Sequence, residues 1–157
     1  MSTTQDKIKR DPTLYNEEFN KILEVFQVIF DDFLQCPNKQ VKGIKELVLF
    51  FAHVGYIYPK RISFIPFKLI SLIENNYSNI SPEIRFAIVE SLSLLRKKNL
   101  LEAVEYLYLI KFSSKFRILP LFFKLLKCQD KELRKKLQDI IISDLTKVNK
   151  VHKNNVS

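Results

Sequence analysis

The chain has 157 residues, of which 46% are hydrophobic and 27% are charged, a balance typical of a folded chain rather than a disordered one. Only two residues are glycine, which argues against glycine-rich phosphate loops and against a turn-rich all-β fold. The formal net charge of +9 favours polyanionic partners, meaning RNA, DNA or acidic protein surfaces. An ordinary solvated surface of a chain rich in lysine and asparagine explains the same charge equally well.

The first residues and the longest uncharged run bear on the cellular compartment. Met1–Lys7 is polar and has no signal-peptide pattern. Leu47–Pro59 is the longest uncharged run, and its thirteen residues are too few to span a bilayer. Cys36 and Cys128 lie far apart in the sequence without a CxxC spacing, so we expect two free, structural thiols. Together these features predict a soluble intracellular protein.

The first half of the chain predicts three helices after a polar start. We expect residues 1–10 to be flexible and Asp11-Pro12 to begin a helix, because Asp is a good cap and Pro suits the first helical position. The apolar stripe of this helix runs to Phe33, and the helix must end before Pro37. Two further helices are predicted over 39–56 and 62–74, with a polar loop at 75–79.

The second half predicts a helix that begins at Ser81-Pro82 and ends in the basic run 96–99. Residues 100–119 fit either one helix or a helix followed by an irregular join. Pro120 restarts a helix that should end near Cys128. Asp130 is then the predicted N-cap of a last helix, whose apolar stripe is Leu133, Leu137, Ile140, Ile141 and Leu145. The tail 149–157 loses this stripe, and we expect it to be flexible.

An internal repeat suggests how these helices are arranged. The twelve residues from Ser81 match those from Asp130 in the cap, a Glu, an aliphatic residue, an Arg and a second aliphatic residue. The offset of 49 residues is close to the period of helical repeats, about 40–47 residues. We therefore predict an all-α fold of about six helices, in antiparallel pairs stacked as an armadillo/HEAT-like α-solenoid fragment. Its repeat domain should span 11–148, between the flexible ends 1–10 and 149–157.

Two groups of basic residues are the candidate partner or RNA surface. Arg96, Lys97 and Lys98 end one predicted helix, where positive charge suits the negative helix end in any case. The second group follows the last cap and extends into the tail: Lys131, Lys135, Lys136, Lys150 and Lys153. A solvated helix face is the structural alternative, and contact with rRNA phosphates is the functional hypothesis.

The sequence offers no basis for catalysis. It has no Gly-rich phosphate loop, no Ser/His/Asp set and no spacing of metal ligands. Glu17 and Glu18 are adjacent, so they face different sides of a helix rather than forming a carboxylate pair. We therefore expect no enzymatic activity, no cofactor and no small-molecule substrate.

Several phrases, taken in order, resemble one protein family. They include Ile8-Lys-Arg-Asp-Pro-Thr-Leu-Tyr-Asn, Glu46-Leu-Val-Leu-Phe-Phe-Ala-His-Val, Pro82-Glu-Ile-Arg, Leu121-Phe-Phe-Lys-Leu-Leu-Lys-Cys-Gln-Asp-Lys-Glu-Leu-Arg-Lys and Asn149-Lys-Val-His-Lys-Asn-Asn. Their order and spacing resemble the "severe depolymerization of actin" family, and they cover nearly the whole chain. The likeness is to the N-terminal helical-repeat region of a longer family, with an insertion within 102–119.

The resemblance implies a function that composition alone does not reach. It implies a non-enzymatic scaffold in the nucleus and nucleolus that acts in large-subunit (60S) ribosome biogenesis and in nuclear export of pre-ribosomes. Its partners would be the rRNA and the assembly-factor proteins of the pre-ribosomal particle, without a membrane. It also implies an indirect link to actin cytoskeleton organisation. The alternative is an α-solenoid adaptor for protein cargo in transport that makes no direct RNA contact.

Overall fold

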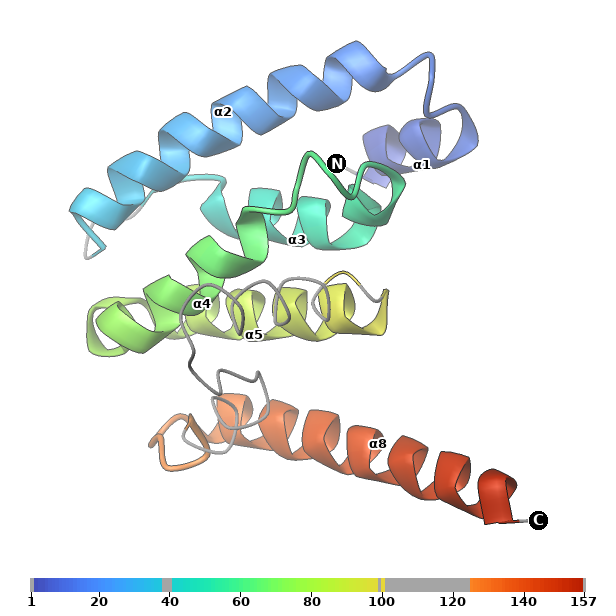
Figure 1. Cartoon of the computed structure of the whole chain (residues 1–157). Helices are drawn as coiled ribbons and strands as arrows, with labels where there is room; N and C mark the ends of the chain where they lie inside the picture. The colour runs from blue at the N-terminus through green and yellow to red at the C-terminus, as the bar shows by residue number, and fades with distance from the viewer. Residues whose placement is uncertain (1, 38–40, 99, 101–124, 157) are drawn as a thin grey trace, which may run out of the picture.

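Six α-helices and two short 3-10 helices make up the part of the chain that the structure describes, and that part contains no strand (Figure 1). The computed structural model describes residues 2–37, 41–98, 100 and 125–156. The elements in chain order are α1 (Ser2–Arg10), α2 (Asn16–Gln35), α3 (Ile44–Val54), η1 (Gly55–Ile57), α4 (Ile65–Asn76), η2 (Tyr77–Asn79), α5 (Pro82–Lys97) and α8 (Lys131–Val156). The predicted all-α class is confirmed.

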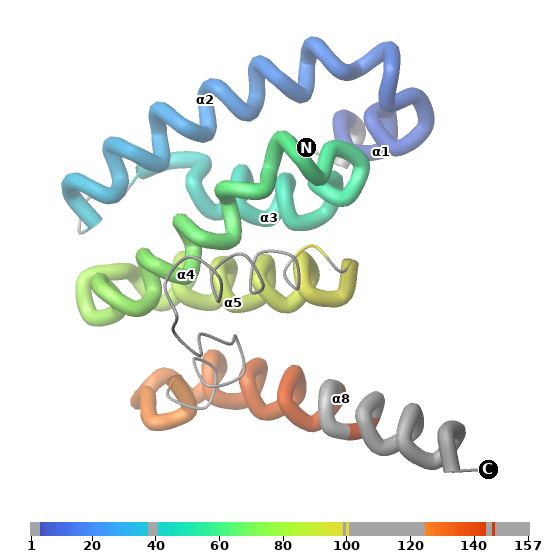
Figure 2. Tube along the Cα trace, in the orientation of Figure 1, coloured from blue at the N-terminus to red at the C-terminus, as the bar shows by residue number. Residues whose placement is uncertain are grey.

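The helices form antiparallel pairs that stack in one direction. α3 runs back beneath α2, and α5 runs back beside α4 (Figure 1, Figure 2). α3, α5 and α8 then follow one another as parallel neighbours, with α3 packed on α5 and α5 packed on α8. Each pair therefore contacts its neighbours in the stack, which is the arrangement of a HEAT-like α-solenoid.

The internal repeat corresponds to successive helices of the parallel layer. α5 begins at Pro82 and α8 begins 49 residues later at Lys131. The first backbone hydrogen bonds are equivalent, because the amide of Arg85 donates to the Ser81 carbonyl and the amide of Arg134 donates to the Asp130 carbonyl, both at 3.0 Å. The predicted side-chain cap is present at Asp130, whose Oδ1 accepts from the Leu133 amide at 3.1 Å, but the Ser81 side chain makes no capping hydrogen bond. The sequence repeat is therefore a repeat of structure.

Phenylalanine side chains hold the first helix pair together. Phe19, Phe26, Phe30 and Phe33 line the inner side of α2 and are fully buried. Phe51 of α3 inserts between them, with its ring centroid 5.6 Å from that of Phe19 and 5.0 Å from that of Phe26. Burying a phenylalanine side chain contributes roughly 1.5–3 kcal/mol, and paired rings add to this. The α2–α3 pair is accordingly the most aromatic part of the core.

Aliphatic side chains hold the second layer. Four of the five residues of the stripe predicted for the last helix face the core, since Leu133 and Leu137 are fully buried and Ile140 and Ile141 are nearly so, while the side chain of Leu145 lies outside the described part. On the facing helix α5, the buried aliphatic residues are Ile88, Val89, Leu92 and Leu95. This packing joins α8 to the stack.

The first ten residues differ from the sequence-based expectation of a flexible start. Residues Ser2–Arg10 form α1, which contacts α3. Its Ile8 is fully buried in the common core, and this long-range contact explains why a mostly polar segment is helical here. The next helix also begins later than predicted, at Asn16. Asp11 instead closes the preceding turn, because its Oδ1 accepts from the Leu14 amide at 3.1 Å.

Several later boundaries shift for local reasons. α3 begins at Ile44 rather than near residue 39, because Gly43 adopts a left-handed conformation with φ of +87° directly before it. α4 runs through Asn76 and η2 follows it, where the sequence predicted a polar loop. α8 continues to Val156, past the predicted start of a flexible tail. The ambiguous segment 101–119, with its predicted insertion, lies outside the described residues.

One glycine is required by close packing. Gly55 begins η1, directly after α3, and is buried. A Cβ atom at this position would overlap Cδ1 of Ile62, whose side chain is itself buried. The chain therefore turns tightly from α3 toward α4 at a residue without a side chain.

Replacing Phe51 with alanine should destabilise the chain strongly, because the ring fills the space between two buried rings of α2. The expected loss of unfolding free energy is about 3–5 kcal/mol, measured by urea denaturation. Leu14→Ala is the matched control, since Leu14 is 68% exposed and should change stability by less than about 0.5 kcal/mol. Equal stability of the two variants would show that the aromatic cluster does not hold α2 on α3.

Candidate nucleic-acid interface

The structure divides the predicted basic residues among different places in the stack. Arg96 and Lys97 lie in the last turn of α5, whereas Lys131 and Lys135 lie in the first turns of α8. Because α5 and α8 run in the same direction, these two groups are at opposite ends of the layer (Figure 1). Lys150 and Lys153 belong to the last turns of α8, and their side chains lie outside the part that the structure describes.

The first turns of α8 offer two solvent-facing lysines rather than three. Lys131 and Lys135 are exposed. Lys136 is half-buried, and its Nζ lies 5.9 Å from the ring centroid of Phe86 on α5. A lysine over an aromatic face contributes to packing between the helices. Lys136 therefore has a structural role that the sequence did not indicate.

The basic residues at the end of α5 likewise differ in exposure. Arg96 is half-buried and interacts within the protein, so its guanidinium is partly committed to the fold. Lys97 and Lys98 are exposed. Lys98 Nζ lies 4.4 Å from the ring centroid of Tyr56 in η1, and this ring is 39% exposed. The contact joins the end of α5 to the segment that follows α3.

Two further basic residues, Lys60 and Arg61, belong to the same region but were not singled out by the sequence. Both are exposed, in the turn after η1. Arg61 Nη1 donates to Asn20 Oδ1 at 3.0 Å and also to Asn16 Oδ1, and its Cζ lies 5.2 Å from the ring centroid of Tyr58. In the sequence these residues fall only in the gap between the predicted helices 39–56 and 62–74, because the residues that they contact are distant in the chain.

Tyr58 fixes that turn against the start of the chain. Its ring lies 4.2 Å from the ring of Phe19, and its hydroxyl donates to the Pro12 carbonyl. Burial raises the pKa of Tyr58, with an opposing effect of Arg61 and a smaller raising effect of Asp11. The raised pKa keeps the hydroxyl protonated, as its role as a donor requires. The exposed basic end of α1 is thereby tied to the Lys60–Arg61 turn.

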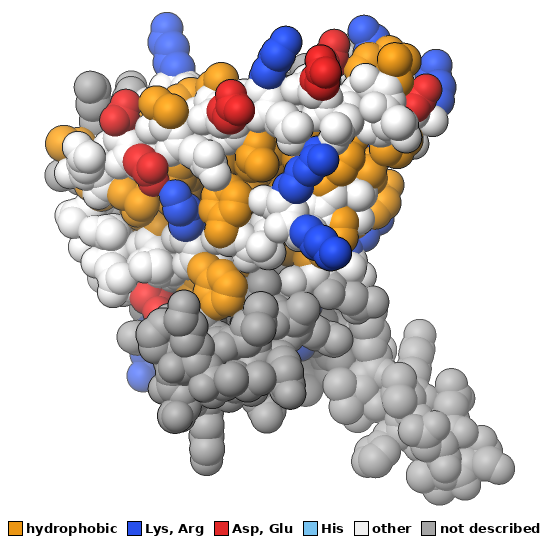
Figure 3. Space-filling model, turned by 45° about the horizontal axis from the view of Figure 1, so that its top comes forward, with side chains coloured by type: hydrophobic (Ala, Val, Ile, Leu, Met, Phe, Trp, Pro, Cys, Tyr) orange, Lys and Arg blue, Asp and Glu red, His pale blue; other side chains and the backbone are white. Residues whose placement is uncertain are grey.

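These contacts define one surface, which we call the basic edge. It consists of Lys7, Lys9 and Arg10 at the end of α1, Lys60 and Arg61 after η1, and Lys97 and Lys98 at the end of α5. Blue side chains gather over this end of the molecule in Figure 3. Tyr56 is exposed beside them. Cations next to an accessible aromatic ring are the combination that binds single-stranded nucleic acid, through phosphates and a stacked base.

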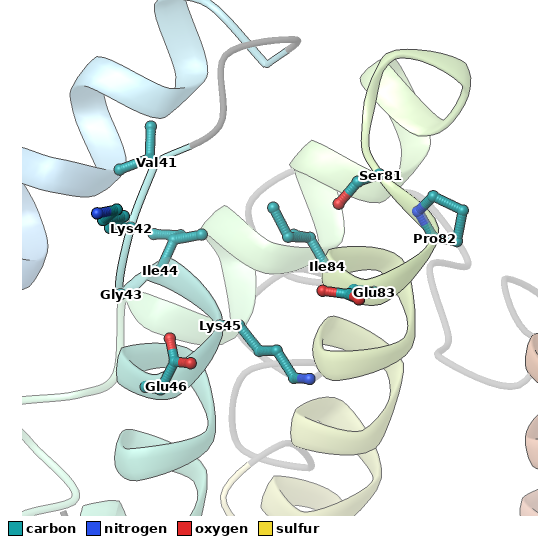
Figure 4. Close-up of a pocket in the computed structure, with 10 residues that line it drawn as sticks. All are labelled: Val41, Lys42, Gly43, Ile44, Lys45, Glu46, Ser81, Pro82, Glu83 and Ile84. Carbon is teal, nitrogen blue, oxygen red and sulfur yellow. The ribbon is translucent and has the colours of Figure 1, made fainter.

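The opposite edge of the stack has a groove of about 810 Å³ between the starts of α3 and α5. Figure 4 shows Ile44 and Ile84 pointing toward one another across it, and Lys45 extending toward α5, the helix that carries Glu83. Lys42 and Glu46 complete its charged lining, so the two lysines are balanced by two carboxylates. A lining without net charge is not selective for phosphate, in contrast to the basic edge.

The two cysteines are free thiols, as the sequence predicts. Cys36 is exposed. Cys128 is half-buried in the turn before α8, where its Sγ lies 3.6 Å from the Asp130 carbonyl and its thiol also hydrogen-bonds the side chain of Tyr77. Arg85 packs on this Tyr77–Cys128 contact, with its Cζ 4.5 Å from the Tyr77 ring centroid and its Nη1 donating to the Tyr77 carbonyl at 3.2 Å. Cys128 thus belongs to the contact between successive repeats.

No group of three or more His, Cys, Asp or Glu residues in the described part of the chain is placed to hold a metal ion. None of the helices in the described ranges is long and apolar enough to cross a membrane.

Comparison with known proteins gives a consistent result. The family model described as "SDA1, HEAT repeat" matches residues 50–157. "Protein SDA1 homolog" of Xenopus tropicalis is 36% identical over 151 residues, which are 96% of this chain and 20% of that protein. The homologue of Dictyostelium discoideum is 35% identical (96% of this chain, 18% of that protein), and that of Drosophila melanogaster is 36% identical (95% and 19%). The chain spans about a fifth of the length of these curated relatives.

The stability of the contact between repeats at Tyr77 and Cys128 should decrease at high pH. Burial and the hydrogen bond with Cys128 raise the pKa of Tyr77 from 10.0 to about 12. Its folded-state pKa is above its unfolded value, so the stabilisation is complete below pH 10 and is lost as the pH rises through about 12. The unfolding free energy of the wild type should fall more steeply between pH 10 and 12 than that of Tyr77→Phe. Identical slopes for the two proteins would refute this assignment.

Proposed function

We propose a function from one premise, that this chain belongs to the SDA1 family through its HEAT-repeat region. The proposed function is that of a non-enzymatic scaffold in large (60S) ribosomal subunit biogenesis. In this role the stack would bind the pre-ribosomal particle through both its rRNA and its assembly-factor proteins. The proposal is supported by the shape, because an α-solenoid presents an extended surface to large partners.

The observation that carries the RNA part of this proposal is the basic edge. The fold brings together cations from three separate segments, in α1, after η1 and at the end of α5. Lys60 and Arg61 are not in the last turn of a helix, so the helix dipole does not account for them. Lysines that bind RNA phosphates release counterions, so binding through this edge would depend steeply on salt.

The proposal extends to features for which the family resemblance is the support. It places the protein in the nucleus and nucleolus and gives it a part in the nuclear export of pre-ribosomes. It includes an indirect link to actin cytoskeleton organisation. It assigns no catalytic activity, cofactor or small-molecule substrate to the chain.

The adaptor alternative differs in what it requires of the basic edge. A transport adaptor for protein cargo would bind without direct RNA contact, and its binding would depend little on these lysines. Crosslinking of the full-length protein on purified pre-ribosomes decides between the two. RNA crosslinks at residues 56–61 and 96–98 support the scaffold, and crosslinks to protein alone support the adaptor.

Removing two charges from the basic edge should weaken RNA binding. We expect Lys97→Gln/Lys98→Gln to flatten the slope of log K against log salt by about 1.4, since each phosphate contact on a single strand contributes about 0.7. The measurement is a titration of a single-stranded RNA oligonucleotide at several salt concentrations, with circular dichroism to verify the fold. Lys42→Gln/Lys45→Gln is the matched control, because it removes the same charge from the groove. Equal slopes for the two variants would exclude a specific RNA contact at this edge.

The start of α8 provides a second, separable test. Lys131 and Lys135 are exposed and on one face, being four residues apart. If a long RNA follows the stack, Lys131→Gln/Lys135→Gln should weaken binding of a long RNA while leaving a short oligonucleotide bound at the basic edge unaffected. Equal losses for both RNA lengths would mean that only total charge matters, and no loss for either would leave these lysines as solvated surface.

A further inference from the structure

A second apolar stripe runs along the side of α2 that faces away from the core. Val25 and Val28 are 52% and 64% exposed, whereas Phe26 between them is fully buried. Ile22 and Ile29 lie one turn before and after Val25, are half-buried and pack against the core, so they border the exposed valines on the core side. Valine is not a favoured residue on a solvated helix face, and its exposure gains no burial energy. The fold alone therefore does not account for this stripe.

Carboxylates lie beside the exposed valines, together with one cation, Lys21, which is exposed one turn before Val25. Glu18, Glu24 and Asp32 are exposed and form no ion pair with any described side chain. Asp31 differs, because Lys68 Nζ donates to its Oδ1 at 2.9 Å. Asp32 lies in the last turn of α2, where a negative charge opposes the helix dipole and destabilises the helix. We call Glu18, Glu24, Val25, Val28 and Asp32 the acidic-apolar face.

The charge of α2 is opposite to that of the chain. The helix contains five acidic residues and one lysine, a net charge of −4, which leaves +13 for the remainder of a chain with a net charge of +9. Figure 3 shows red side chains spaced along α2 with orange ones between them. α2 is also the outermost helix at its end of the stack, opposite α8 among the described helices (Figure 1). Its outer side is therefore available to a partner.

We propose that the acidic-apolar face docks an amphipathic helix of a partner protein, rich in Lys and Arg. Aliphatic residues of that helix would cover Val25 and Val28. Its cations would pair with Glu18, Glu24 and Asp32 around the apolar contact, as in other complexes in which a helix lies in a groove or on a face. Charge complementarity selects this occupant, because a helix of net charge −4 repels RNA and other anions.

The test uses a designed probe and the full chain. The probe is a fluorescent helical peptide of about 20 residues, with Leu on one face and Lys on the other at helical spacing. We expect Val25→Ser/Val28→Ser to raise its Kd about tenfold, as for residues at the centre of an interface. Glu18→Gln/Glu24→Gln/Asp32→Asn should raise the Kd similarly and also reduce its dependence on salt.

Three controls make the result specific. Glu83→Gln/Glu132→Gln/Asp139→Asn removes the same charge from exposed positions on α5 and α8 and should change the Kd less than about twofold. Binding of an RNA oligonucleotide should not weaken in either α2 variant, which separates this docking face from the proposed RNA surface. Unchanged peptide affinity in Val25→Ser/Val28→Ser would overturn the proposal. So would light scattering that shows a wild-type dimer dissociated by this variant, because the occupant would then be a second copy of the chain.

Discussion

The parallel stacking of α3, α5 and α8 is the constraint on which the distribution of charge depends. Three helices that run in the same direction bring their positive amino ends to one edge and their negative carboxyl ends to the other. Glu46, Glu83 and Glu132 lie in the first turns of these helices, and Lys97 lies in the last turn of α5. Part of the segregation of acidic and basic side chains is therefore a requirement of helix stability rather than of binding.

The charged and apolar side chains that helix stability does not require are more informative about function. Lys60 and Arg61 add positive charge to the carboxyl-end edge from a turn, outside any helix terminus. The negative charge of Asp32 in the last turn of α2 opposes the helix dipole, which lowers the stability of the helix by about 0.3–1 kcal/mol. Exposed Val25 and Val28 add no stability through burial. Arg61 also holds its turn on α2, through Asn16 and Asn20. A binding role is the simpler physical explanation for Lys60, Val25, Val28 and Asp32, and these residues lie on two separate surfaces.

The features predictable from the sequence are those that depend on neighbours in the chain. The Asp130 cap, the stripe through Leu133 and Leu137 and the helix start after Ser81 are all encoded within a few residues, and each is present, although the Ser81 side chain does not cap its helix. The features that were missed depend on distant contacts. Ile8 is buried because α1 meets α3, and the Lys60–Arg61 turn joins the basic edge because Tyr58 binds near Pro12. Lys136 was treated as a surface charge because Phe86, fifty residues earlier, could not be placed beside it.

If both proposals hold, separated charges would let one small stack bind two partners that attract each other. RNA and Lys/Arg-rich protein segments bind one another through the same phosphate contacts that would hold RNA on the basic edge. A uniformly basic scaffold would compete with such segments for RNA, and a uniformly acidic one would compete with RNA for the segments. With the acidic-apolar face on α2 and the basic edge at the carboxyl ends of α3 and α5, each proposed partner would be attracted to a surface that repels the other. The geometry of the stack would then fix the distance and orientation between them, which is what a scaffold contributes that its partners lack.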